Sequence, residues 1–345
     1  MFLVGFLTTD KKFAELIGTV AFAHGIDFYY FSKKDIDTKG KEIIYGHAWN
    51  RERACFERQE RKYPDIIDFS TEGWSNELRK NFKPKSLFVF GTTLKNKAKS
   101  NEIIKNSEYS RFSIATHFYN DINIDELLQK YDAVMIKSNT GMKGESAHKL
   151  TKNDDKYVLC SGSLSKELND SEYLEYATLF ASQKYIVQPF HSFTTKSGNP
   201  FDIRVVVHRG KNGVFTYIQT FIRVGSKQGI VSNISRGGYG VTRKWESFIE
   251  TEITPTNKQH ILSELAVIKK HLPQILQNGY SGHISCIAFD IGYDRNTNEV
   301  KIIEVNAMPL ITKSLQPDMA SVKIEHWKYL FKNHEKFFAI QNKKK

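Results

Sequence analysis

The sequence contains few cysteines and no long apolar run. Cys55, Cys160 and Cys286 lie far apart among 345 residues, and no CxxC pair occurs. This number and spacing argue against a disulfide framework or a zinc site and fit a reducing cytosol. No run approaches the roughly 18 apolar residues of a membrane-spanning helix. The short apolar start, residues 1–7, lacks the basic leader of a signal peptide. We therefore expect a cytoplasmic protein without a transmembrane segment.

Patterns typical of nucleic-acid-binding proteins are also missing. There is no helix-turn-helix, zinc-finger or RNP1-like pattern, so we expect no specific nucleic-acid partner. The formal charge of +12 nevertheless favours an anionic partner. Because the charge is spread along the chain, a solvated lysine-rich surface is the alternative, and non-specific nucleic-acid binding stays open. The basic, aromatic C-terminus, residues 327–345, indicates either a frayed helix or weak contact with an anionic surface.

The length and the pattern of apolar residues predict several α/β units. A chain of 345 residues exceeds one average domain. Apolar runs at 2–7 and 27–31 flank a segment with helical spacing, which predicts a βα unit of an open α/β sheet, and a domain boundary is expected near residues 91–93. The same reading predicts further strands at 43–45, 66–69, 87–90, 133–137, 185–188, 203–208, 214–223, 286–292 and 300–305. It predicts helices at 97–105, 124–131, 256–277 and 322–338, with mostly strands from residue 157 onward.

Two acids and an amide are expected on one face of a hairpin near the C-terminus. Residues 295–298 are turn-rich, so the flanking strands should pair about a centre near residue 297. Asp290 then lies opposite Glu304, and Asn306 shares the face of Glu304. Neighbouring carboxylates repel each other unless a cation is present, and such oxygen ligands suit Mg²⁺. Pairing of the two acids with nearby lysines is the alternative.

A lysine at a strand end is a candidate phosphate contact. Lys137 ends an apolar strand and precedes a loop that contains Gly141 and Gly144. A lysine and loop N–H groups together can hold a phosphate, although the GxxxxGK[ST] spacing is absent. Many buried strands end in a lysine, so this pattern alone does not specify a phosphate site.

Charged residues on two neighbouring strands are further candidates. Asp202 and Arg204 share one strand face, and Arg223 ends the following strand. Arginine can hold a transferring phosphoryl group through paired hydrogen bonds. The alternative is an ion pair of Asp202 with Arg204 or Arg223. Asn233 lies in the polar loop 232–238. It is a candidate oxygen ligand or phosphate contact, and the alternative is that the loop is an ordinary turn.

Taken in order, these segments resemble the ATP-grasp superfamily. The similarity is closest to the YheC/YheD-like branch and more distant to ligases of the RimK and glutathione-synthetase types. It covers roughly residues 92–330 and is carried by residues 135–144, 185–188, 201–205, 230–238, 289–292 and 303–309. A departure is that Lys137 is followed by serine, where the family usually has proline.

The resemblance implies a fold and a set of site residues. The fold is α/β and α+β, with a Rossmann-like domain, 1–91, followed by an ATP-grasp fold of two α+β subdomains, 92–190 and 191–345. ATP and Mg²⁺, in two ions, are the implied cofactors. The implied nucleotide contacts are Lys97, Lys137, Gly141, Gly144, Asp202, Asn233 and, at the adenine hinge, Gln188. The implied metal ligands are Asp290, Glu304 and Asn306, and Arg204 and Arg223 are the implied contacts of the phosphate or the intermediate.

The resemblance also implies an activity. ATP-grasp ligases activate a carboxylate as an acyl phosphate, which an amine then attacks, so we expect an ATP-dependent carboxylate–amine ligase with a carboxylate and an amine as substrates. Homodimers are common among such ligases. The alternative is a catalytically inactive ATP-grasp protein with a binding or coat-like role, against which the intact set of two acids and an amide argues.

Overall fold

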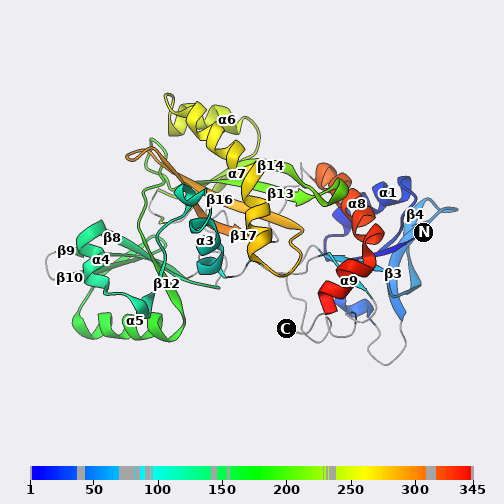
Figure 1. Cartoon of the computed structure of the whole chain (residues 1–345), viewed down its shortest axis with the longest axis horizontal. Helices are drawn as coiled ribbons and strands as arrows, with labels where there is room; N and C mark the ends of the chain where they lie inside the picture. The colour runs from blue at the N-terminus through cyan, green and yellow to red at the C-terminus, as the bar shows by residue number, and fades with distance from the viewer. Residues whose placement is uncertain are drawn as a thin grey trace.

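The fold is that of a computed structural model, in which three β-sheets lie in a row along the long axis (Figure 1). The N-terminal sheet is at one end, the second sheet is at the other, and the third lies between them. Within the described residues, no helix is long and apolar enough to cross a membrane. The structure describes residues 2–36, 43–69, 82, 86–89, 94, 96–140, 146–153, 156–227, 229–230, 232, 238–307 and 316–342.

The N-terminal sheet has, among the described residues, six strands in the order β4-β3-β2-β1-β5-β6. Strands β2, β1, β5 and β6 are parallel, and β3 and β4 add an antiparallel hairpin at one edge. The strand–helix–strand unit β1–α1–β2 confirms the predicted start of the chain, while the Rossmann-like nature of the domain stays a prediction. The bounds are β1 Leu3–Leu7, α1 Lys11–Ala23, β2 Asp27–Phe31, β3 Ile43–Asn50, β4 Cys55–Lys62, β5 Ile66–Phe69 and β6 Leu87–Phe88.

The second sheet is antiparallel throughout its described strands, in the order β11-β10-β9-β8-β12-β7. Helices α4 and α5 belong to the same end of the molecule (Figure 1). The predicted strands at 133–137 and 185–188 are confirmed as β8 and β12. The bounds are β7 His117–Phe118, α4 Ile124–Tyr131, β8 Ala133–Ser138, β9 Ala147–Asn153, β10 Lys156–Ser161, β11 Leu164–Leu168, α5 Asp170–Ser182 and β12 Tyr185–Pro189.

Helix α5 corrects the expectation of mostly strands after residue 157. It begins at a capping box, in which the Asn169 side chain accepts from the Glu172 N–H and the Glu172 side chain accepts from the Asn169 N–H. Phe180 is its one buried residue, and Leu174 is exposed. Because the helix buries so little, it carries no clear apolar stripe for a sequence pattern to detect.

The third sheet has the order β15-β14-β13-β16-β17 over the described residues. One face of β13 and β16 packs in an apolar core with helix α7, through residues such as Val205 and Phe289. On the opposite face, Val206 and Ala288 pack against the C-terminal helix α8. The bounds are α3 Lys97–Lys105, β13 Phe201–Arg209, β14 Phe215–Val224, β15 Tyr239–Val241, α6 Trp245–Phe248, α7 Lys258–Gly279, β16 Cys286–Asp294 and β17 Glu299–Asn306.

The C-terminal segment returns to the N-terminal sheet as two helices, α8 (Gln316–Lys332) and α9 (His334–Asn342). The expected single helix over 322–338 is therefore wrong. The two helices are separated at Asn333, where the side-chain amide and the backbone N–H both donate to the Tyr329 carbonyl, at 2.8 and 3.2 Å. The division into 1–91, 92–190 and 191–345 stays a prediction, and α8 and α9 share a core with the first sheet.

A buried ion pair anchors α8 on that sheet. The Asp68 carboxylate on β5 accepts from the Lys323 ammonium and the Trp327 indole N–H, each at 2.8 Å. All three residues are buried. A buried charge needs such partners, because removing one of them leaves the other desolvated and uncompensated.

We expect Asp68→Ala to lower the free energy of unfolding by about 3–5 kcal/mol, since the Lys323 ammonium loses its carboxylate in a buried site. Chemical denaturation measures the change. Glu167→Ala, which removes an exposed ion pair with Lys156, is the control and should have little effect. Equal effects of the two substitutions would contradict the anchoring role of Asp68.

Candidate active site

The hairpin β16–β17 contains a bulge at the point where the acidic residues lie. Asp290 pairs with Glu304, which confirms the predicted register. Nearer the turn, Ile291 pairs with Ile302, so Ile303 is an extra residue on β17. A bulge interrupts the ladder and redirects the groups around it. Here the Ile303 carbonyl accepts a hydrogen bond from the Lys137 ammonium at 3.1 Å.

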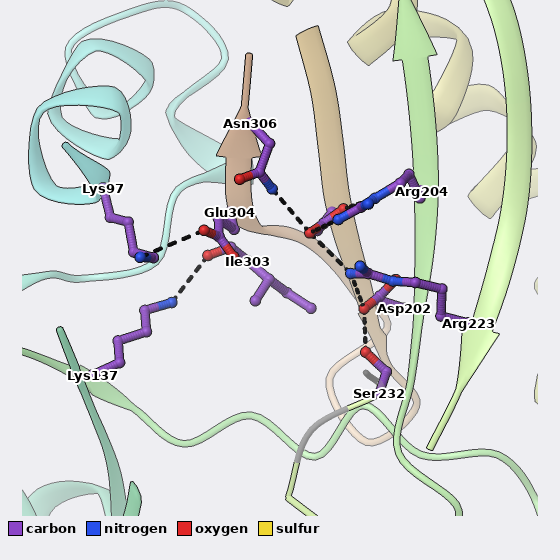
Figure 2. Close-up of polar contacts among 10 residues, drawn as sticks. Lys97, Lys137, Asp202, Arg204, Arg223, Ser232, Ile303, Glu304 and Asn306 are labelled. Atoms are coloured by element: carbon purple, nitrogen blue, oxygen red, sulfur yellow. Dashed lines mark hydrogen bonds and ion pairs between the residues drawn. The ribbon is translucent and has the colours of Figure 1, made fainter. Parts of the chain in front are cut away.

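Asp290 lies at the centre of a charged cluster on the third sheet. Its partners Arg204, Arg223 and Asn306 are labelled in Figure 2. Its carboxylate accepts from Arg204 Nε (2.6 Å) and Nη2 (2.7 Å) in a two-pronged pair. Arg223 Nη2 lies 2.9 Å from Oδ2, and Asn306 Nδ2 lies 3.2 Å from the same oxygen. Arg204 stands directly opposite Asp290 in the β13–β16 ladder, which places the two side chains within reach.

Asp202 forms the second carboxylate of the cluster. It accepts two hydrogen bonds from Arg223, at 2.7 and 2.6 Å, and one from the Ser232 hydroxyl. Asp202 and Arg223 are directly opposite each other on β13 and β14. The Asp202–Arg223 ion pair weighed as an alternative is therefore present. Arg204 pairs with Asp290 rather than with Asp202.

The surroundings shift the ionisation of this cluster in opposite directions. Burial works against ionisation of Asp290, but Arg204 and Arg223 outweigh it and hold its pKa at about 2. Burial raises the pKa of Asp202, with Arg223 opposing and the neighbouring Asp290 adding to the rise. The pKa of Arg223 rises, since its two carboxylate partners outweigh burial. Asp290, which two guanidinium groups contact, is thus the firmly ionised acid.

Two lysines from different elements approach Glu304. Lys97, at the start of α3, lies 3.5 Å from the Glu304 carboxylate and donates to the Ser138 carbonyl at 3.2 Å. Lys137 on β8 points toward the same part of β17 (Figure 2). Burial lowers the pKa of Lys137 to about 8, with Glu304 raising it and Lys97 lowering it further. The pairing of Glu304 with a lysine, the other alternative, is present as well.

These side chains open into a cavity of about 340 Å³ between the second and third sheets. Its volume falls in the range of small-molecule sites. Charged groups lie on both sides of it, and apolar groups such as Met135 and Phe190 complete the wall. The polar residues of its lining include Lys97, Lys137, Lys149, Gln188, Thr194 and Glu304, and Ser232 joins the cavity to the Asp202 cluster.

The Gln188 amide is oriented by a hydrogen-bond network. Its Nε2 donates to the Thr116 hydroxyl at 2.7 Å. That hydroxyl donates to the Ile114 carbonyl (2.8 Å) and also accepts from Asn101 Nδ2 (2.9 Å). Asn101 itself is oriented by the backbone of Ile114, whose N–H donates to Oδ1 and whose carbonyl accepts from Nδ2. With the Thr116 proton engaged by Ile114, Gln188 presents its amide nitrogen to Thr116, and its carbonyl oxygen stays available as an acceptor.

The structure thus brings together the described members of the predicted site. Lys97, Lys137, Gln188 and Glu304 line the cavity. Asp202, Arg204, Arg223, Asp290 and Asn306 form the adjoining cluster. Gly141, Gly144 and Asn233 lie outside the described residues, so their predicted roles are untested.

Several contributors were not predicted. Ser232 contacts Asp202, and Thr116 and Asn101 orient Gln188. Lys149 lines the cavity two residues after Ala147 on β9, an alternation that a strand prediction at this place would have indicated. For Thr116 no local pattern offers such a signal, because its partner Gln188 is 72 residues away.

The predicted metal ligands fit a hard divalent cation in their chemistry. Asp290 and Glu304 supply carboxylate oxygens, and the Asn306 amide already lies beside Asp290. In the part of the chain that the structure describes, no three His, Cys, Asp or Glu side chains are grouped to hold a metal ion. The proposed set differs from such a group in having two acids and one amide.

Comparison with known proteins assigns this architecture to a family. The model of the YheC/D-like ATP-grasp family matches residues 86–333. The endospore coat-associated protein YheD of Bacillus subtilis (strain 168) is 25% identical over 193 residues, which cover 54% of this chain and 41% of YheD. The match therefore spans about two fifths of the length of that relative.

Solved structures share the fold at low identity. The N5-carboxyaminoimidazole synthetase of Staphylococcus aureus has a TM-score of 0.53 at 12% identity, covering 97% of this chain and 85% of that enzyme. Its complex with ADP gives a TM-score of 0.50, also at 12% identity, and covers 90% and 71%. The D-cycloserine synthetase DcsG gives 0.52 at 10% identity, covering 94% and 98%. These likenesses confirm the predicted α/β and α+β fold class with an ATP-grasp fold.

We expect the Lys137 amine to titrate near pH 8, well below its ordinary pKa of 10.5. The measurement is a pH titration of isotope-labelled dimethyl-lysine signals by NMR, with Lys137→Arg identifying the signal. Glu304→Gln should lower the midpoint further, because it removes a negative charge that favours the ammonium form. A midpoint near 10.5 would show that the ammonium is fully solvated.

Proposed function

Because this chain belongs to the YheC/D-like ATP-grasp family, we propose that it is an ATP-dependent carboxylate–amine ligase. The observation that carries the proposal is the convergence of Lys97, Lys137 and Glu304 on one cavity between two sheets. Cationic groups of this kind suit a polyphosphate, and carboxylates suit the divalent cation that accompanies it. A solved synthetase with the same fold is complexed with ADP, which supports nucleotide binding by a protein of this fold.

The proposed reaction has two steps. A carboxylate oxygen of the substrate attacks the γ-phosphorus of ATP, and the bond to the β-phosphate oxygen breaks, which yields an acyl phosphate and ADP. The amine then attacks the acyl carbon and loses a proton as inorganic phosphate leaves. In this scheme Lys97 and Lys137 hold the phosphates, and Arg204 and Arg223 stabilise the negative charge that develops. Mg²⁺ held by Asp290, Glu304 and Asn306 would neutralise charge on the triphosphate.

The ligase proposal predicts that Glu304→Gln abolishes ADP formation. The measurement is a screen of ADP release in which a set of carboxylates is combined with a set of amines. The substitution should lower turnover by roughly a hundredfold or more, as does the loss of one preorganised polar group in other enzymes. Glu299→Gln on the same strand, where an exposed carboxylate pairs with Lys301, is the matched control and should keep wild-type turnover. If Glu304→Gln turned over normally, the site assignment would be wrong.

The oriented Gln188 amide predicts a preference for adenine. A carbonyl oxygen that faces the cavity accepts from the 6-amino group of adenine and repels the 6-oxo group of guanine. Thr116→Val removes the acceptor that holds the amide, so the ratio of ATP to GTP affinity should fall by about two- to tenfold, the worth of one hydrogen bond. Calorimetry measures both affinities. Thr194→Val, elsewhere in the cavity wall, should keep the ratio, and an unchanged ratio in Thr116→Val would refute the orienting role.

A second candidate is a nucleotide-binding protein without ligase activity. It is favoured by the relative YheD, which is described as endospore coat-associated. The two candidates differ in one observable: a binding protein retains ATP affinity but releases no ADP with any carboxylate–amine pair. The ion pairs that occupy Asp290 and Glu304 are compatible with either candidate, so the ADP screen decides between them.

A further inference from the structure

The Oδ2 oxygen of Asp290 is saturated with hydrogen bonds from the chain itself. Four N–H contacts surround the two oxygens of the carboxylate, and three of the four reach Oδ2. An ionised carboxylate offers about four lone-pair sites in all. A cation shared by Asp290 and Asn306 needs an oxygen from each, and Oδ2 is the Asp290 oxygen beside Asn306. Such a cation cannot bind until at least one of the present donors leaves.

The two arginines differ in how firmly they are held. Arg223 makes a two-pronged pair with Asp202 and reaches Asp290 with one nitrogen. Arg204 directs both of its bonding nitrogens to Asp290, and within the described residues it has no other hydrogen-bond or ion-pair partner. If another cation bound Asp290, Arg223 would keep its ion pair with Asp202. Arg204 would lose both of its hydrogen bonds and its ion pair.

We propose that Arg204 is a displaceable internal counter-ion: it occupies Asp290 in the metal-free protein and gives way to the divalent cation. This inference rests on the proposed ligase function. A buried carboxylate without a counter-charge is costly, so Arg204 keeps Asp290 ionised until the cation arrives. The exchange replaces one cation by another at the same carboxylate. It also frees a guanidinium group beside the site of phosphoryl transfer, where the proposed reaction develops negative charge.

The exchange has a consequence for metal affinity, because Arg204 and the cation compete for one carboxylate. Removing the competitor should tighten cation binding even without nucleotide or turnover. A purely structural Arg204 predicts the opposite, since its loss would loosen Asp290 and weaken the site. Loss of positive charge elsewhere in the cavity should have only a small effect, because salt screens charges that do not touch the ligands.

The test is the affinity of the full-length protein for Mn²⁺ alone, measured by electron paramagnetic resonance or calorimetry. We expect Arg204→Met to bind Mn²⁺ at least about tenfold more tightly than the wild type, the scale of a charge-assisted hydrogen bond. Arg204→Lys keeps the charge but cannot form the two-pronged pair, so its affinity should lie between the two. It also serves if the methionine variant does not fold. Lys149→Met, which removes a cavity charge that contacts Phe190, should change affinity by less than about threefold.

Three results would overturn the exchange. One is Mn²⁺ affinity in both Arg204 variants no tighter than in the wild type. Another is an equal gain in Lys149→Met, which would reduce the effect to overall charge. The third is unchanged binding in Asp290→Asn, which would place the ion elsewhere. If neither the wild type nor any variant bound Mn²⁺, the metal site of the proposed ligase would be refuted as well. Equal binding by the wild type and Arg204→Met would refute only the exchange and leave the metal site in place.

Discussion

The carboxylate of Asp290 is an ionised group in a strand whose nine residues are all buried. A charge in such a place requires counter-charges, and they come from the neighbouring strands: Arg204 from β13 and Arg223 from β14. Asn306 on β17 completes the ring. This requirement ties four adjacent strands of the third sheet together in one polar network. It also decides which side chains face the cavity, since Arg223 holds Asp202, and Asp202 holds Ser232 in the cavity wall.

The two ends of this sheet face are used differently. At one end His208 and Cys286 face each other across β13 and β16. There burial lowers the pKa of His208, His326 and His283, the last to about 3, so these histidines are neutral. The helix α8 covers this end and is anchored to the first sheet through Asp68. At the other end, which the cavity adjoins, the same face carries charges. The histidines are therefore uncharged where helix packing closes the sheet, whereas acids and arginines gather where the sheet adjoins the cavity.

Short-range sequence patterns made part of the fold and of the site predictable. The alternation of side chains along a strand and the turn at 295–298 were enough to place Asp290 opposite Glu304, and the structure agrees. An apolar side with Leu127 and Leu128 indicated the helix at 124–131, and the structure gives it the same bounds. Helix α5 was missed because its capping box, rather than an apolar stripe, defines it. The break at Asn333 was missed because the helical spacing of apolar residues continues across it, from Leu330 to Phe338.

What the sequence alone determined is which residues have the chemistry for a site and which of them share a strand face. The shared face is predictable because side chains along a strand alternate between the two faces of the sheet, and because a short turn pairs strands that are close in the sequence. What only the tertiary structure decided is how those residues are paired. Three contacts join segments that are far apart in the sequence. They are the bond of Lys137 to the Ile303 carbonyl at the bulge, the approach of Lys97 to Glu304, and the Thr116–Gln188 bond. The pairing of Asp290 with Arg204 likewise depends on strand order, because residues 86 positions apart become neighbours only when β13 lies beside β16.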